Sequence, residues 1–145
     1  MTCPECGSEQ VAFRVPADLR EYLPEETETA AICTVCLALD LGESALGDSV
    51  TDDSATESSV AESPDFGRIS DAFPGGDVGV AMALAVGLLD SLALYRSEIS
   101  ALLDRVERAG TDPLLVLDRL ETDPKLDPHF DVDRRRTQAE QLLYD

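Results

Sequence analysis

The sequence contains no tryptophan and few aromatic residues of any kind, so a folded core has to be built from aliphatic side chains. Aromatic residues make up 5% of the 145 residues, whereas hydrophobic residues as a whole make up 43%. A chain of this length suffices for one ordinary domain or two small ones. We therefore expect part of the chain to fold around an aliphatic core.

Positive charge is scarce as well. The chain has 11 lysine and arginine residues against 30 aspartates and glutamates, a formal net charge of −19, and Lys125 is its single lysine. This balance argues against nucleic-acid binding, because lysine and arginine that neutralise phosphates supply most of that affinity. An acidic surface almost without lysine resembles proteins of salt-loving archaea, in whose cytosol the Debye length falls to ~3 Å or less and screens such self-repulsion.

No stretch is long and apolar enough to span a membrane. The most apolar run, Val78–Leu89, has twelve residues between two aspartates, whereas a membrane span needs ~20. The chain opens directly on Cys3, without the basic and apolar regions of a secretion signal. We therefore expect a cytoplasmic protein with no membrane partner, in which paired cysteines are more often metal ligands than disulfides.

Cysteine is rare, but all four cysteines fall in two C-x-x-C pairs, Cys3/Cys6 and Cys33/Cys36, which are separated by 26 residues. Each pair brings two sulfur atoms to one point through a tight turn, so two such knuckles can supply four thiolates to a tetrahedral Zn²⁺ ion at ~2.3 Å. Structural zinc is the favoured interpretation. A rubredoxin-like iron site and dithiol redox chemistry are the alternatives. Four sulfur ligands leave no open coordination position, which argues against catalytic zinc.

The residues around the knuckles alternate as in a small β ribbon. Three strands are expected, carrying Val11, Phe13 and Val15, then Ala30 and Ile32, and finally Leu37, Leu39 and Leu41. Residues 16–26 predict one helical turn that covers the sheet with Leu19, Tyr22 and Leu23. About 42 residues cannot build a sufficient hydrophobic core alone, so a structural metal suits this region.

The first knuckle, C-P-E-C-G, resembles the CPxCG-type zinc fingers of small halophilic-archaeal proteins. The second knuckle, C-T-V-C-L, has neither the proline nor the glycine. The layout of the whole chain resembles an uncharacterised halophilic-archaeal family with an N-terminal four-cysteine zinc ribbon and a helical C-terminal domain. The resemblance implies Zn²⁺ bound by Cys3, Cys6, Cys33 and Cys36, and it carries no established activity.

Charge and composition divide the chain into three regions. Residues 1–42 hold the cysteines, with eight acids and two arginines. Residues 43–65 have seven acids, no base and six serines, so they cannot bury enough apolar surface to offset their ordering entropy. The predicted fold class is α+β: a β zinc ribbon over 1–42, an acidic flexible linker over 43–65 and an antiparallel helical bundle over 66–145.

Apolar periodicity predicts the helices of the third region. Residues 77–109 form one helix or two, with Gly87 or the Tyr95 region as candidate breaks and Gly110 as the stop. Asp112 and Pro113 predict the start of the next helix, and a last helix covers roughly 131–143. A seam of heptad spacing is expected, which either packs within the chain or forms a homodimer. Its residues are Leu88, Leu92, Tyr95, Ile99, Leu102 and Val106.

Three further groups have simple structural interpretations. His129, the only histidine, is expected at a loop surface. The basic run Arg134–Arg136 is explained by ion pairs along a helix, with Asp131 and Glu140 four residues from their partners. Asp90 is expected to face solvent or to pair with an arginine such as Arg96 or Arg119.

No nucleophile–base pair, phosphate-binding loop or carboxylate constellation is recognisable in the sequence. We therefore expect a non-enzymatic zinc-binding protein that acts as a protein-interaction or regulatory adaptor, with a protein partner of unknown identity. The alternatives are a rubredoxin-like iron electron-transfer protein and, less favoured, a nucleic-acid-binding zinc ribbon.

Overall fold

The computed structural model describes residues 3, 6–23, 29–41, 66–128 and 130–144, and these ranges confirm the predicted α+β class. Three strands, β1 (Gln10–Arg14), β2 (Thr29–Cys33) and β3 (Leu39–Leu41), form an antiparallel sheet in the order β1-β2-β3. Ile32 of the central strand lies opposite Val11 on one side and Leu39 on the other. Strand β1 follows the predicted alternation, because Val11 and Phe13 are buried and Arg14 is exposed. The central strand β2 does not alternate, since Ala30 to Cys33 are all buried. The third strand is shorter than predicted, because Leu37 lies in the turn before β3 with a positive φ.

The predicted helical turn after the first strand is present as α1 (Ala17–Arg20). Leu19 is buried within it, Leu23 is buried just beyond it and Tyr22 packs partly buried against the same core. An ion pair between Asp18 and Arg105 joins this turn to the helical half of the chain.

A short 3-10 turn, η1 (Phe66–Arg68), precedes two helices, α4 (Gly76–Leu89) and α5 (Arg96–Arg108). The question of one helix or two is therefore settled as two. Gly87 lies inside α4, and the break extends over residues 90–95, where the amides of Leu94 and Tyr95 donate to the carbonyl of Ser91. Of the two candidate breaks, the Tyr95 region is thus the correct one. Asp90, at the end of α4, is exposed as expected.

The predicted seam residues pack within the chain, which is one of the two expected alternatives, although their heptad spacing runs across this break. The apolar members Leu88, Leu92, Ile99, Leu102 and Val106 are buried in the core of the same chain, and Tyr95 packs partly buried against that core. A spacing of alternating 3 and 4 residues arose from two separate helices that pack against each other.

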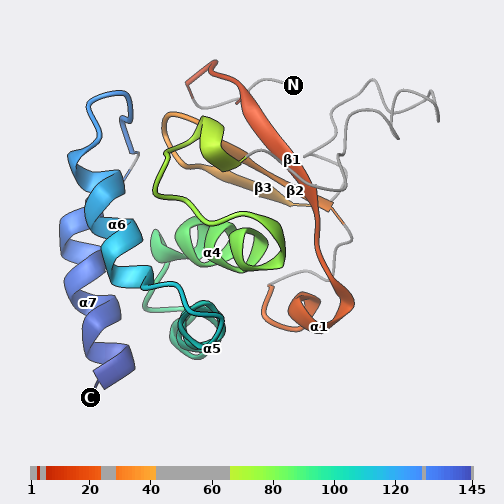
Figure 1. Cartoon of the computed structure of the whole chain (residues 1–145), viewed down its shortest axis with the longest axis vertical. Coiled ribbons are helices and arrows are strands. Elements are labelled where there is room, and N and C mark those ends of the chain that lie inside the picture. Colours follow the sequence, from red (N-terminus) through yellow and green to blue (C-terminus); the bar gives the residue numbers. More distant parts are fainter. Residues whose placement is uncertain (1–2, 4–5, 24–28, 42–65, 129, 145) are drawn as a thin grey trace.

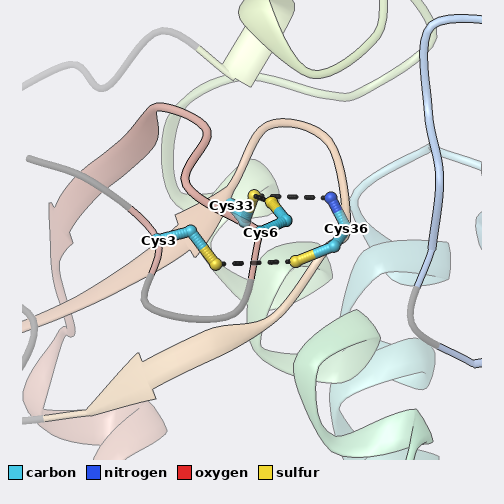
Figure 2. Close-up of side chains that lie close together, drawn as sticks. All are labelled: Cys3, Cys6, Cys33 and Cys36. Atoms are coloured by element: carbon cyan, nitrogen blue, oxygen red, sulfur yellow. Dashed lines mark hydrogen bonds between the residues drawn. The ribbon is translucent and has the colours of Figure 1, made fainter.

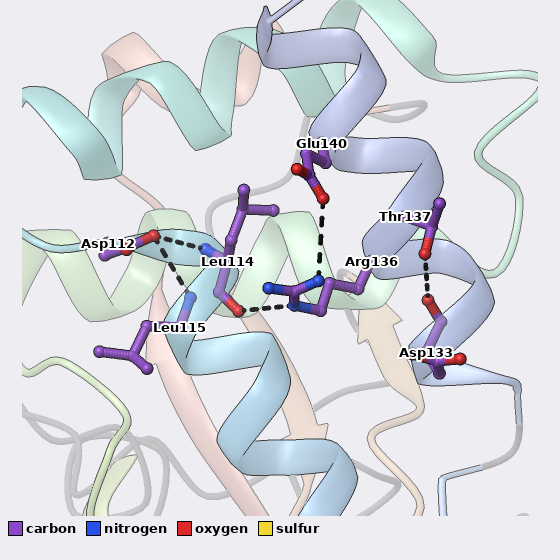
Figure 3. A network of polar contacts seen from close by, with 7 residues as sticks. All are labelled: Asp112, Leu114, Leu115, Asp133, Arg136, Thr137 and Glu140. Carbon is purple, nitrogen blue, oxygen red and sulfur yellow. Dashed lines mark hydrogen bonds and ion pairs between the residues drawn. The ribbon is translucent and has the colours of Figure 1, made fainter.

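Both predicted helix boundaries near Gly110 and Asp112 are confirmed. Gly110 has a φ of 98°, and the amides of Gly110 and Thr111 donate to the carbonyls of Glu107 and Val106, which is a Schellman motif. Helix α6 (Pro113–Thr122) starts at Asp112, whose carboxylate accepts from the amides of Leu114 and Leu115 (Figure 3).

The last helix, α7 (Val132–Tyr144), lies beside α6 and is joined to it by Arg136. The Arg136 guanidinium donates to the Leu114 carbonyl at 3.2 Å and pairs with Glu140 at 3.8 Å, as the i,i+4 spacing predicted (Figure 3). Arg135 does not show the predicted side-chain pair; it donates to Gln138 Oε1 and to the Asp90 carbonyl. His129 lies outside the described residues.

Helix α4 occupies the centre of the molecule, with the sheet on one side and α5 on the other (Figure 1). Its residues are buried almost throughout, as its all-round apolar sequence predicted. Gly87 allows the close approach to the sheet, because a Cβ added there would lie 2.4 Å from Leu39 Cβ of β3. Gly87 therefore serves packing and does not break the helix.

One hydrophobic cluster contains side chains from the sheet and from all the long helices. Phe13 contacts Phe66 edge to face, with ring centroids 5.4 Å apart, and Phe66 stacks on Phe73. Residues 1–42 therefore do not build a core of their own; α4 completes it. The linker predicted at 43–65 lies outside the described residues, so the domain boundaries stay a prediction.

Among the described residues, none of the helices has the length and apolar character required to cross a membrane.

Candidate metal centre

The first C-x-x-C pair sits on a tight turn that leads into β1. The Gly7 amide donates to the Cys3 carbonyl at 2.9 Å, and the Cys3 amide donates to the Ser8 carbonyl at 2.7 Å. Gly7 has a φ of 78°, in the left-handed region that glycine adopts without steric cost. The C-P-E-C-G sequence thus meets the backbone requirement that follows the second cysteine of the knuckle.

The second C-x-x-C pair forms a matching turn between β2 and β3. The Cys33 amide donates to the Ala38 carbonyl at 2.9 Å, the same five-residue bond that joins Cys3 to Ser8. Leu37 stands where the first knuckle has Gly7, and its φ is 64°, the only positive φ of a non-glycine residue in the described part of the chain. The knuckle therefore keeps its geometry without glycine, with a fully buried leucine in a strained conformation.

The two turns bring all four predicted ligands together (Figure 2). Cys3 Sγ lies 3.6 Å from Cys36 Sγ, Cys6 Sγ lies 3.4 Å from Cys33 Sγ, and all four sulfur atoms lie within 4.8 Å of one another. A regular tetrahedron with metal–sulfur bonds of ~2.3 Å has edges of about 3.8 Å. The four cysteines are free thiols in this structure, and the distances between their sulfur atoms are close to those between four ligands of one ion.

Backbone amides favour the thiolate form of one sulfur in particular. The amides of Val35 and Cys36 both donate to Cys33 Sγ at 3.3 Å. Hydrogen bonds of this kind stabilise negative charge on sulfur and are a common means of tuning metal thiolates. The turn that holds Cys33 and Cys36 therefore positions the Cys33 sulfur and also stabilises negative charge on it.

Burial has the opposite effect, because it disfavours the thiolate form of the cysteines. Desolvation raises the pKa of the Cys33 and Cys36 thiols, because a charged sulfur is disfavoured away from water. Hydrogen bonds from Ser8 lower the pKa of the exposed Cys6 thiol to about 6. Buried thiols that resist ionisation become thiolates when a cation supplies the missing positive charge. The electrostatics of the site thus match a metal centre better than free thiols.

The knuckles are tied to their surroundings by contacts that the sequence did not reveal. Thr34 donates to the Glu9 carbonyl through its amide and its hydroxyl, which joins the two knuckles. Glu9 forms an ion pair with Arg68 of η1, and the hydrogen bond and charge of Arg68 lower the pKa of the Glu9 carboxyl. The Asp127 amide, between α6 and α7, donates to the Val35 carbonyl at 2.9 Å. The helical half of the chain therefore contacts the second knuckle directly.

Four cysteine thiolates are a donor set that suits Zn²⁺ and iron and does not suit Mg²⁺ or Ca²⁺, which take oxygen ligands. The four cysteines together could hold a metal ion. Three of them, Cys3, Cys33 and Cys36, form a small cluster with their apolar neighbours Val35 and Ala38, apart from the main core. The residues present therefore fit the group that the sequence predicted.

The chain belongs to a protein family described as a family of unknown function (DUF6276), whose model matches residues 2–143. No curated protein and no solved structure matches the chain. The matched range includes both cysteine pairs and the helices as far as residue 143.

Proposed function

We propose that the protein binds one Zn²⁺ ion through Cys3, Cys6, Cys33 and Cys36, and that this ion has a structural role. The proposal rests on the arrangement of the four sulfur atoms, which lie within 4.8 Å of one another in two matching turns. Four thiolates complete a tetrahedral shell and leave no position for water or substrate. The ion would hold two turns together at one end of the sheet, beside the last residue of β2.

The proposal includes a non-enzymatic role as a protein-interaction or regulatory adaptor of the zinc-ribbon kind. A closed metal site supports it, since such a site positions chain segments and does no chemistry on a substrate. The charge supports a protein partner over a nucleic acid, because Arg14 and Arg20 face eight acids within residues 1–42 and a Zn²⁺ ion with four thiolates adds two further negative charges. A gel-shift series across salt concentrations that retains nucleic acid would contradict this part.

We infer further that the protein works in the cytoplasm of a salt-loving archaeon. A reducing compartment keeps C-x-x-C pairs available for metal. A net charge of −19 with a single lysine suits a solvent of strong salt, where the self-repulsion is screened.

Iron electron transfer is the second candidate, favoured by the two amides that donate to Cys33 Sγ. Such hydrogen bonds tune the potential of iron thiolates as readily as they stabilise zinc thiolates. Cys6 at the surface would also give an electron a short path to the metal. A red preparation from iron-replete cells would favour iron, because Zn²⁺ thiolates are colourless.

The direct test is elemental analysis of the natively isolated full chain, combined with its mass under native conditions. We expect one zinc per chain. Cys36→Ser should lose the zinc, whereas Ser97→Ala, an exposed change on α5, should keep it. A freshly isolated chain without any metal would refute the proposal. The native mass gives the number of subunits in the same experiment.

A further inference from the structure

The four sulfur atoms differ in their access to solvent. Cys3, Cys33 and Cys36 are at most 4% exposed, whereas Cys6 is exposed at the surface. A dissolved oxidant can therefore reach Cys6 first. Oxidation of cysteine depends on exposure and on thiolate character, and a metal-bound cysteine is a thiolate.

The exposed Cys6 has a second cysteine, Cys33, beside it. Cys33 Sγ lies 3.4 Å from Cys6 Sγ (Figure 2). The amides of Val35 and Cys36 donate to Cys33 Sγ and hold it in this position. Redox-responsive cysteines are accessible and lie next to a resolving cysteine, and this pair has both properties. The two residues come from different knuckles, so a bond between them would join turns that the metal joins in the reduced state.

We propose that Cys6 is an oxidation site and that a peroxide converts Cys6 and Cys33 into a disulfide, which releases the metal from the centre. This inference rests on the proposed zinc site and names its regulation. The ligand chemistry is that of a hydroperoxide, with hydrogen peroxide as the simplest member.

Hydrogen peroxide oxidises Cys6 and Cys33 in two steps. The Cys6 thiolate attacks one oxygen of hydrogen peroxide; an S–O bond forms, the O–O bond breaks and hydroxide leaves. The Cys33 thiolate then attacks the Cys6 sulfur; an S–S bond forms, the S–O bond breaks and a second hydroxide leaves. Two thiolates are oxidised by two electrons, and the peroxide is reduced. Only Cys3 and Cys36 would then remain to hold the ion, and two thiolates are fewer than the four ligands of a structural zinc site, so the ion would be released.

The change is transmitted beyond the centre because Cys33 anchors the second knuckle. Disulfide formation shortens the sulfur separation from 3.4 Å to ~2.05 Å, and it replaces the anionic acceptor of two backbone amides with a neutral one. The Val35 carbonyl in the same turn accepts from Asp127 between α6 and α7. Peroxide would thus loosen the contact between the knuckle and the helical half of the chain.

The test uses the zinc-loaded full chain, treated with hydrogen peroxide in the presence of a chromogenic zinc chelator. The zinc content measured before treatment tests the proposed function separately. We expect release of one zinc per chain and recovery of zinc binding after a dithiol reductant. Trypsin separates the knuckles into peptides 1–14 and 21–68, so the predicted disulfide links two peptides, while a bond within either C-x-x-C pair links none.

Two matched variants assign the roles, since histidine keeps a zinc ligand and removes the thiol. Cys6→His should lose the fast phase of zinc release. Cys33→His should keep the fast first oxidation and accumulate a Cys6 sulfenic acid that dimedone traps. Identifying which two cysteines form the disulfide in the wild-type chain tests the proposal even if a variant does not bind zinc. A zinc-loaded chain that retains its metal under peroxide, or that forms a Cys3–Cys6 bond first, would overturn the inference.

Discussion

Leu37 allows a sharp test of how the second knuckle is stabilised, because two effects oppose each other at this residue. Its φ of 64° lies in a region that costs an L-residue roughly 1–2 kcal/mol relative to glycine. Its side chain is also fully buried in the main hydrophobic cluster. Sequence comparison with the first knuckle, which has Gly7 at this place, would suggest that Leu37→Gly stabilises the protein.

The structure predicts the opposite sign. Truncation of a buried leucine to alanine costs about 2–5 kcal/mol. Leu37→Gly would recover roughly 1–2 kcal/mol of backbone strain, less the ~0.4–1 kcal/mol by which glycine favours the unfolded chain. The burial term is larger. We therefore expect Leu37→Gly to destabilise the fold by roughly 0.4–5 kcal/mol, and by slightly less than Leu37→Ala.

The assay is urea unfolding at a fixed concentration of free zinc, followed by the helical circular dichroism signal. Gly7→Ala is the matched control, because Gly7 has a φ of 78° with no atom within 4 Å of an added Cβ, so the substitution measures the backbone cost alone. We expect that cost to be about 1 kcal/mol. A Leu37→Gly protein at least as stable as the wild type would show that strain outweighs burial, and the reasoning would fail.

Three other outcomes are expected. Gly87→Ala gains ~1 kcal/mol of helix propensity but places a Cβ 2.4 Å from Leu39 Cβ of β3, at a cost of roughly 1–3 kcal/mol. The midpoint of thermal unfolding should therefore fall. Gly75→Ala is the control and should change that midpoint little, because no atom lies within 4 Å of an added Cβ there. Removal of the metal by a chelator should speed amide hydrogen exchange at Asp127, which donates to the second knuckle; unchanged exchange there would contradict the proposed connection. In the metal-free protein, iodoacetamide should label Cys6 first, with a rate that rises through a pH of about 6 because the hydroxyl and the backbone of Ser8 lower that thiol's pKa. Ser8→Ala removes the hydroxyl and should move this midpoint to higher pH, and a midpoint that stays in place would exclude the Ser8 hydroxyl as a cause.

Much of the fold could be predicted because the strongest signals are local. The alternation of Val11 and Phe13 indicated the first strand, and the cap at Asp112 indicated the start of α6 to the residue. The exact break between α4 and α5 could not be found in this way. The spacing from Leu88 to Val106 continues through it, since residues on two packed helices can imitate the period of one.

At the metal centre, the cysteine spacing predicted which side chains come together, and the structure brings all four within 4.8 Å. It could not reveal the supports of the site. The hydrogen bond from Asp127 to Val35 joins residues far apart in the chain and involves only backbone atoms, so no side-chain pattern encodes it. The positive φ of Leu37 was equally hidden, although its position after the second cysteine, where the first knuckle has glycine, was the available signal.

The position of α4 also changes what the metal has to do. The sequence suggested that a metal replaces a core which residues 1–42 are too few to build. In the structure, Phe13, Leu19 and Ile32 are fully buried in a cluster that α4 completes. The buried cysteines form a separate small cluster at one end of the sheet, where β2 ends at Cys33. Burial of these apolar side chains contributes roughly 1.5–3 kcal/mol each, independently of any ion. A bound ion would therefore serve to fix the two turns and the contacts that depend on them, while the sheet itself is held against α4 by apolar packing.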